Sequence, residues 1–307
     1  MSPTGPLASP SSILLATDLG ARCDRALARA VMLARHWNAR LVAVTVAPSE
    51  RSTELRRELL PSPAWARPGT PAQDAERELR RDLDDCGAGV EDVEVEVHVE
   101  SGEVGPALLH AAERHRCDLI VTGIAKGGPL LSSLPGATIR WLSRHAPQPL
   151  LVVRGRPRHA YRHIAFASDF STPAGHALAV AARWFGDTAT AGALVHGADV
   201  PMLGLVEAGT RREELIADTL DEALEQARTT LDASGLPALL RGNVVPVVEH
   251  MEPARLIREY VRSRDADLVS VGSHGRSMLS DVLLGSVAQR ILESAHCDVL
   301  LVRRPAG

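Results

Sequence analysis

The sequence predicts an α/β protein built from two tandem, doubly wound, mostly parallel five-stranded sheets flanked by helices. Three observations lead to this prediction. The length of 307 residues suits two domains of about 150 residues each. Short apolar runs of strand length alternate with amphipathic helical segments, which implies right-handed crossovers and helices on both faces of a parallel sheet. The whole pattern also occurs twice along the chain.

The first half contains the elements of one such domain in order. Apolar runs of strand length end in polar residues or glycine, and the segments between them are rich in Ala, Leu and charged residues. A polar excursion with several prolines interrupts the pattern at 49–73. We expect strands at 13–17, 41–46, 93–99, 119–122 and 150–153, and helices at 22–37, 74–85, 104–115 and 137–145.

The second half repeats this order. Pro173 fits the first turn of its helix, where a missing backbone N–H is tolerated. The charged helix at 212–233 is expected to present a solvated face. We expect strands at 164–168, 193–196, 244–248, 268–271 and 299–302, and helices at 173–185, 212–233, 252–264 and 286–294.

Constant spacings between matching residues support the repeat. Asp18 and Asp169 are 151 residues apart, and a gap-free shift of 149 pairs Gly123 with Gly272. A repeat of domain length indicates duplication rather than a solenoid. We therefore predict two domains, 1–156 and 157–307.

The last strand of each half would be an exposed sheet edge, which is an aggregation hazard. We expect the strands at 150–153 and 299–302 to pair with each other and so hide both edges. A homodimer is a further expectation.

Composition argues against several classes of partner. Aromatic residues make up only 3% of the chain, so the core is aliphatic and base-stacking platforms are scarce. The formal net charge is −4 with no basic stripe, which argues against nucleic acid and membrane surfaces. The first residues resemble a flexible tail rather than a signal peptide, and we expect a soluble cytoplasmic protein.

Cysteine and histidine spacings predict no metal site. Cys23, Cys86, Cys117 and Cys297 form no C-x-x-C pair and are interpreted as free thiols, with Cys117 and Cys297 as buried small residues. The histidines at 98, 110 and 115 are close in sequence, and of these His110 and His115 alone could have a helical metal spacing. Surface positions are favoured for all three.

A glycine-bearing loop follows the apolar strand that ends at Gly272. Its spacing is Gly272-x2-Gly275-x9-Gly285-Ser286, with a helix starting at its end. Glycines let the backbone approach an anion closely, and the N–H groups and dipole of the helix face it. Ligands of such sheets bind beyond the carboxyl ends of the strands, so Asp169 and Gly272 should lie at one rim.

The glycine loop and the strand that ends in Asp169 resemble the sequence of a known family. The segment V-G-S-H-G-R-S-M-L-S-D-V-L-L-G-S-V resembles the nucleotide-binding signature of the universal stress proteins, and I-A-F-A-S-D-F-S is similar to that family's first strand and its aspartate. The resemblance spans nearly the whole chain as two copies and implies Rossmann-like, adenine nucleotide α-hydrolase-like domains. It implies ATP in the second domain, with Mg²⁺ or Mn²⁺ held through the phosphates. The implied nucleotide-contacting residues are Asp169, Gly197, Gly272, Ser273, His274, Gly275, Arg276, Gly285, Ser286 and Val287.

Two departures from the family pattern stand out. The family's second strand usually ends His-Val, with the valine behind the adenine, whereas His196-Gly197 offers less apolar surface. In the first copy, Lys126 replaces Gly275 and Ala137 replaces Ser286, so its site is expected to be degenerate.

Structural roles compete with these binding roles. The glycines could serve tight turns only. Ser286 could be an N-cap, worth about 1 kcal/mol to its helix, and Asp169 could cap the helix after it. For His274 a plain loop role is favoured over catalysis or metal binding, and Arg276 could be a solvated loop residue.

The resemblance implies a regulatory role in bacterial stress tolerance, with an unidentified protein partner. No catalytic base aimed at a water is evident, so no catalytic residue is assigned and any ATP hydrolysis should be slow. The alternatives are a slow ATP-hydrolysing enzyme and a nucleotide-free interaction module whose partner surface would be sought at 49–73.

Overall fold

The computed structural model describes residues 8–20, 23–47, 70–86, 89–124, 136–198, 209–273 and 284–303. The strands are β1 (Ser12–Ala16), β2 (Arg40–Ala47), β3 (Val95–Ser101), β4 (Leu119–Gly123), β5 (Leu150–Val153), β6 (His163–Ala167), β7 (Ala191–Gly197), β8 (Val244–Glu249), β9 (Leu268–Gly272) and β10 (Asp298–Val302). The helices are α1 (Asp24–Trp37), α3 (Pro71–Asp84), α4 (Val104–Arg114), α5 (Ala137–His145), α6 (Thr172–Phe185), α7 (Thr210–Ala233), α8 (Pro253–Arg264) and α9 (Ser286–Ser294).

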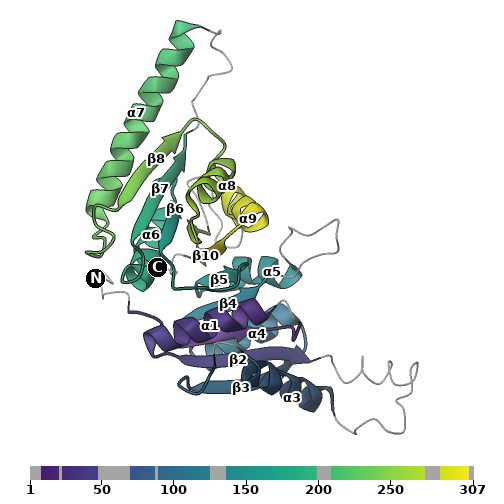
Figure 1. The fold of residues 1–307 in the computed structure, drawn as a ribbon. Coiled ribbons are helices and arrows are strands. Elements are labelled where there is room, and N and C mark those ends of the chain that lie inside the picture. The colour runs from purple at the N-terminus through teal and green to yellow at the C-terminus, as the bar shows by residue number, and fades with distance from the viewer. Residues whose placement is uncertain are drawn as a thin grey trace, which may run out of the picture.

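These strands form a single ten-stranded sheet in the order β3-β2-β1-β4-β5-β10-β9-β6-β7-β8 (Figure 1). Within each half, neighbouring strands are parallel, and the order reverses between β1 and β4 and between β6 and β9. The predicted doubly wound α/β class is therefore confirmed. No helix in the described part of the chain combines the length and apolar composition that a membrane span requires.

The two halves meet where β5 and β10 pair antiparallel, with Val152 opposite Val299 and Leu150 opposite Leu301. This confirms the predicted pairing of the two end strands. The two five-stranded sheets thereby become one, and neither of these strands is left as an edge.

The sheet is buried on both faces. In β1, Ile13 and Leu15 belong to one apolar cluster, and Leu14 and Ala16 belong to the other. Such continuous apolar runs are typical of strands that helices cover on both sides. The first cluster includes residues of α1, α3, α6 and α7, and the second includes residues of α4, α5, α8 and α9.

The region predicted as a polar excursion is partly helical at its end. Thr70 caps α3 by accepting a hydrogen bond from the Gln73 backbone, and the Gln73 side chain returns the bond to the Thr70 N–H. This capping box and Pro71 start the helix three residues earlier than predicted. Residues 48–69 lie outside the described part of the chain. Among the described residues of α7, only Ala223 and Ala227 are buried, which agrees with the solvated face expected for this helix.

A buried carboxylate ties the halves together. Asp298, at the start of β10, is 3% exposed and its Oδ2 accepts a 2.7 Å hydrogen bond from the Tyr161 hydroxyl. Arg29 of α1 places Nε 3.3 Å from the same oxygen, and its guanidinium lies 4.1 Å from the Tyr161 ring centroid. The N–H groups of Arg154 and Gly155, between the halves, donate to Oδ1 at 2.8 and 3.3 Å. The first helix, the linker and the last strand thus share one anchor.

We predict that Asp298→Ala lowers the free energy of unfolding by about 3–5 kcal/mol, because it leaves the Arg29 charge buried without its partner. Tyr161→Phe removes one buried hydrogen bond and should cost about 1–3 kcal/mol. Urea unfolding measures both effects. Asp187→Ala is the control, since its 2.8 Å pair with His36 crosses the same junction but Asp187 is 60% exposed. Equal losses for Asp298→Ala and Asp187→Ala would contradict the assigned anchor.

Candidate functional site

The candidate site of the second half begins at the carboxyl ends of β6 and β9. These strands are parallel neighbours, with Phe166 in register with Ser270, so Asp169 and Gly272 leave the sheet at the same edge. A Cβ at Gly272 would lie 3.1 Å from the carbonyl of Pro173. Glycine therefore lets the first turn of α6 pack against the end of β9, beside the predicted phosphate loop.

The turn after β6 is held by its own polar groups. The Asp169 carboxylate accepts a 3.0 Å hydrogen bond from the Ser171 N–H, and the Ser168 hydroxyl accepts one from the Phe170 N–H. Ser171 is the N-cap of α6 and accepts from the Ala174 N–H. The alternative that Asp169 caps this helix is therefore wrong, because Asp169 closes the turn that precedes it.

The same turn occurs in the first half. Asp18 accepts a 3.0 Å hydrogen bond from the Gly20 N–H, and Leu19 has φ of 57° where Phe170 has φ of 60°. A left-handed conformation costs a non-glycine residue about 1–3 kcal/mol and persists where the surroundings impose it. Both copies thus hold their aspartate in the same strained turn.

The start of α9 is a second part of the site. Gly285 is the N-cap, so the alternative that Ser286 is the N-cap is wrong; Ser286 is the first helical residue and is exposed. The first bond of the helix runs from the Gln289 N–H to the Gly285 carbonyl at 2.9 Å. The three N–H groups before Gln289 thus precede the hydrogen-bond ladder, at the positive end of the helix dipole.

Backbone bonds fix the start of this helix beside the sheet. The Gly285 N–H donates to the Ser273 carbonyl at 2.8 Å, and the Ser273 N–H donates to the Val302 carbonyl at 2.9 Å. The two ends of the loop are therefore clasped together. Ser286 and Val287 follow directly in α9, whereas His274, Gly275 and Arg276 lie outside the described residues.

The end of β7 is the third part of the candidate site in the second half. His196 Nδ1 lies 2.8 Å from the Ser168 carbonyl, and the His196 and Phe170 rings are 4.3 Å apart. A Cβ at Gly197 would lie 2.5 Å from the Met251 carbonyl oxygen. The missing side chain at Gly197 therefore has a packing reason, because the chain entering α8 passes directly against it.

The corresponding rim of the first half encloses a cavity of about 80 Å³. Asp18, Gly123 and Gly136 line it together with Val46 and Cys23. Val46 is a lining residue that the sequence analysis missed. The shift of 151 that pairs Asp18 with Asp169 also pairs Val46 with Gly197, and this spacing could have identified it. The first copy thus retains the apolar residue that the second copy lacks.

The expectation of a surface position is wrong for one of the three clustered histidines, His115. His110 is exposed, as expected. His98 and His115 are partly buried, with side chains 32% and 14% exposed, and both approach Glu96. The burial predicted for Cys117 and Cys297 is confirmed.

We predict that Gly197→Ala destabilises the protein by about 1–3 kcal/mol, because the added methyl group has no room. Gly175→Ala in α6 is the matched control. A Cβ there meets nothing within 4 Å, and replacing a helical glycine should be neutral or stabilising. Urea unfolding compares the two variants, and a neutral Gly197→Ala would show that the close approach is relieved without cost.

Cys23 should be a slow nucleophile in the native state. Burial raises the pKa of its thiol to about 11, and the Asp18 carboxylate 3.0 Å from Sγ adds to the effect. The thiolate is therefore scarce at pH 7 and becomes abundant only as the pH approaches that value. Alkylation of Cys23 in the folded protein, measured by mass spectrometry of the peptide that contains it, should be much slower than in urea. The alkylation rate should increase with pH up to about 11. Equal rates in the folded and unfolded chains at pH 7 would contradict this.

Comparison with known proteins agrees with this geometry. The model of the universal stress protein family matches residues 11–154 and again 160–303. A universal stress protein of Mycolicibacterium smegmatis is 26% identical over 313 residues, covering 96% of this chain and 98% of that protein. A universal stress protein of Methanocaldococcus jannaschii is 33% identical over 110 residues, which cover 34% of this chain and 59% of that protein.

Solved structures share the fold over nearly the full length. A universal stress protein from Archaeoglobus fulgidus has a TM-score of 0.62 at 16% identity, with 97% of this chain and 98% of that chain covered. A functionally unknown protein from Pseudomonas aeruginosa has a TM-score of 0.63 at 18% identity, with coverages of 97% and 94%. The two matches to the family model together span most of the chain, and the chain therefore belongs to the universal stress protein family.

Proposed function

We propose that this protein is a regulatory protein of stress tolerance that binds ATP in its second domain, 157–307. The first domain, 1–156, carries a degenerate copy of the site. The observation that carries the proposal is the spacing Gly272-x2-Gly275-x9-Gly285-Ser286 between β9 and α9. Gly285 has no side chain to cap α9, and among the described residues we therefore expect the N–H groups of the first turn to bind an anion.

The phosphates are the part of the ligand that this motif suits best. The bond between Gly285 and Ser273 holds the start of α9 next to the end of β9. The N–H groups of Ser286 and Val287 would then bind phosphate oxygens, and the exposed Ser286 hydroxyl would add a further donor. His274, Gly275 and Arg276 would complete the loop, with Mg²⁺ or Mn²⁺ held through the phosphates.

The adenosine end of the ligand would lie toward the turn after β6. Asp169 is fixed there by its bond to the Ser171 N–H, and His196 supports the same turn through the Ser168 carbonyl. Gly197 offers the base no side chain, and we therefore expect modest affinity. The phosphate side would supply most of the binding free energy.

The first domain differs where phosphate would bind. Ala137 stands at the position of Ser286, and Lys126 stands at the position of Gly275. Gly136 caps α5 as Gly285 caps α9, so the backbone of the helix start is the same in both copies. The side chains, rather than the fold, are the basis for assigning the nucleotide to the second domain.

Regulation suits the site better than catalysis. Among the described residues of the rim, the carboxylate of Asp169 is engaged by the backbone of its own turn. We therefore propose slow ATP hydrolysis at most, in a cytoplasmic protein whose nucleotide state is sensed by a protein partner.

Asp169→Ala and Asp18→Ala form a matched pair for testing this function. The wild-type protein should gain about 2.7 kcal/mol of stability at MgATP concentrations near 100 times the Kd. We predict that Asp169→Ala reduces this gain, because it removes a contact at the adenosine end of the site. Asp18→Ala should retain the full gain, because only the second domain keeps the phosphate motif. Thermal unfolding with and without MgATP, together with calorimetric titration, measures both.

Ser286→Ala sharpens the test, since it installs the residue found at position 137 and should weaken binding without unfolding the protein. Loss of binding in Asp18→Ala with full binding in Asp169→Ala would move the site to the first domain. No ATP effect on the wild-type protein would favour the nucleotide-free interaction module.

A further inference from the structure

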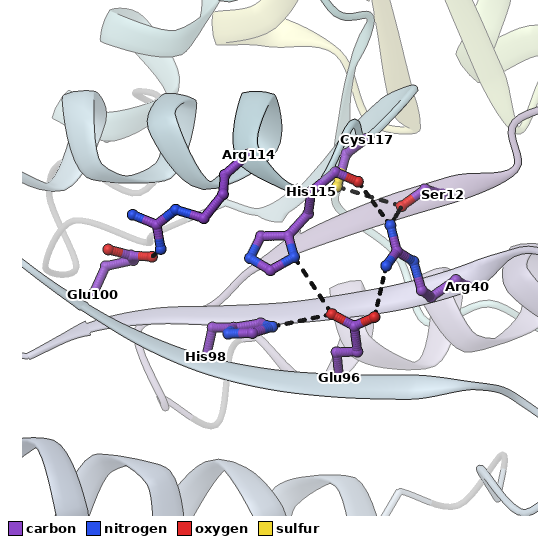
Figure 2. A network of polar contacts seen from close by, with 8 residues as sticks. All are labelled: Ser12, Arg40, Glu96, His98, Glu100, Arg114, His115 and Cys117. Atoms are coloured by element: carbon purple, nitrogen blue, oxygen red, sulfur yellow. Dashed lines mark hydrogen bonds and ion pairs between the residues drawn. The ribbon is translucent and has the colours of Figure 1, made fainter.

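Three potential metal ligands from two separate elements meet in the first half (Figure 2). Glu96 and His98 are two residues apart on β3 and so point to the same face of the sheet. His115 directly follows α4, which packs over that face. His98 Nε2 lies 3.2 Å and His115 Nδ1 lies 3.4 Å from the same oxygen, Glu96 Oε2. The two imidazole centroids are 4.1 Å apart.

We propose that Glu96, His98 and His115 bind a divalent transition-metal ion, for which Zn²⁺ is the best match. Tetrahedral Zn²⁺ with bonds of about 2.0–2.2 Å to nitrogen and oxygen requires its ligand atoms to lie about 3.3–3.5 Å apart. The two distances to Glu96 Oε2 are close to that value, and the three candidate ligand atoms all lie within 4.8 Å of one another. Two imidazoles and one carboxylate leave a fourth position for water or an external ligand.

Neighbouring groups orient the carboxylate. Arg40 Nη1 lies 2.6 Å from Glu96 Oε1, which leaves Oε2 directed at the two imidazoles. Arg40 Nη2 also donates to the His115 backbone carbonyl at 2.7 Å. Such outer contacts fix the geometry of metal ligands. The Arg40 charge also opposes an incoming cation, so we expect a site of moderate affinity.

The two ring nitrogens of His115 have different surroundings. His115 Nδ1 lies beside Glu96 Oε2, whereas the buried Nε2 has no hydrogen-bond partner among the described residues. A metal ion at Nδ1 would take the place of the proton that this nitrogen could otherwise donate to Glu96.

The second half provides an internal comparison without the ligands. Strand pairing places Val42 opposite Glu96 and Ala193 opposite Val245, so Val245 is the counterpart of Glu96. By the same shift of 149, Val247 replaces His98 and Arg264 replaces His115. The fold therefore forms without these three polar residues, so the fold alone does not explain their presence.

The site is also separate from the proposed nucleotide site. Glu96 lies near the amino end of β3, whereas the glycine loops follow the carboxyl ends of β4 and β9. The two sites lie at opposite ends of the strands and in different halves of the chain. Metal binding should consequently be independent of the residues that hold nucleotide.

The test is calorimetric and chelator-competition titration of the full chain with Zn²⁺. The wild-type protein should bind one Zn²⁺ per chain at this site. His98→Val, which installs the residue of the second half, and Glu96→Gln should each weaken binding by at least about 10-fold, the lower limit for loss of even an outer contact. His110→Ala, which removes an exposed histidine of α4, and Asp169→Ala should bind as the wild type does.

A spectroscopic readout separates coordination from a structural effect of the variants. Co²⁺ bound to the wild type should give the visible absorption of a tetrahedral nitrogen and oxygen site, and His98→Val should lose it while its metal-free melting temperature stays near that of the wild type. Absence of Zn²⁺ binding to the wild type would overturn the proposal. Unchanged binding in both His98→Val and Glu96→Gln would overturn it as well.

Discussion

The antiparallel pairing of β5 with β10 is the constraint on which the rest of this structure depends. Each half alone would end in an open apolar edge, and pairing the two edges produces one sheet with a continuous apolar layer on each face. Asp298 secures this junction because its carboxylate is bonded by the first helix, the linker and Tyr161. The two rims therefore belong to one continuous sheet.

Within this framework the two copies have diverged in side chains more than in backbone. The turns after β1 and β6 repeat the aspartate, its hydrogen bond and the left-handed residue that follows. Around these turns the copies differ in complementary ways, since Val46 lines the cavity of the first rim while Ser286 remains only in the second. The histidine and glutamate cluster of the first half is another difference of this kind, since the second half has Val245, Val247 and Arg264 at the matching positions.

Much of the fold was predictable because buried strands and amphipathic helices leave strong local patterns. The helices at 137–145 and 286–294 and the strand at 150–153 have the predicted bounds. The misses involve contacts between segments distant in sequence, or side-chain bonds at helix ends. The start of α3 depends on a capping box, and Gly197 is explained only by the approach of Met251. The contact of His98 and His115 with Glu96 could not be predicted from their spacing, because one histidine lies on a strand and the other at a helix end.

The central claim is that one nucleotide site, in the second half, survives from two duplicated ones. The count of ATP molecules bound per chain tests it most directly, by equilibrium dialysis of labelled ATP against the intact protein. The account predicts saturation at one ATP per chain. Saturation at two would show that Lys126 and Ala137 do not disable the first site, and no bound ATP at saturating concentrations would contradict the claim altogether.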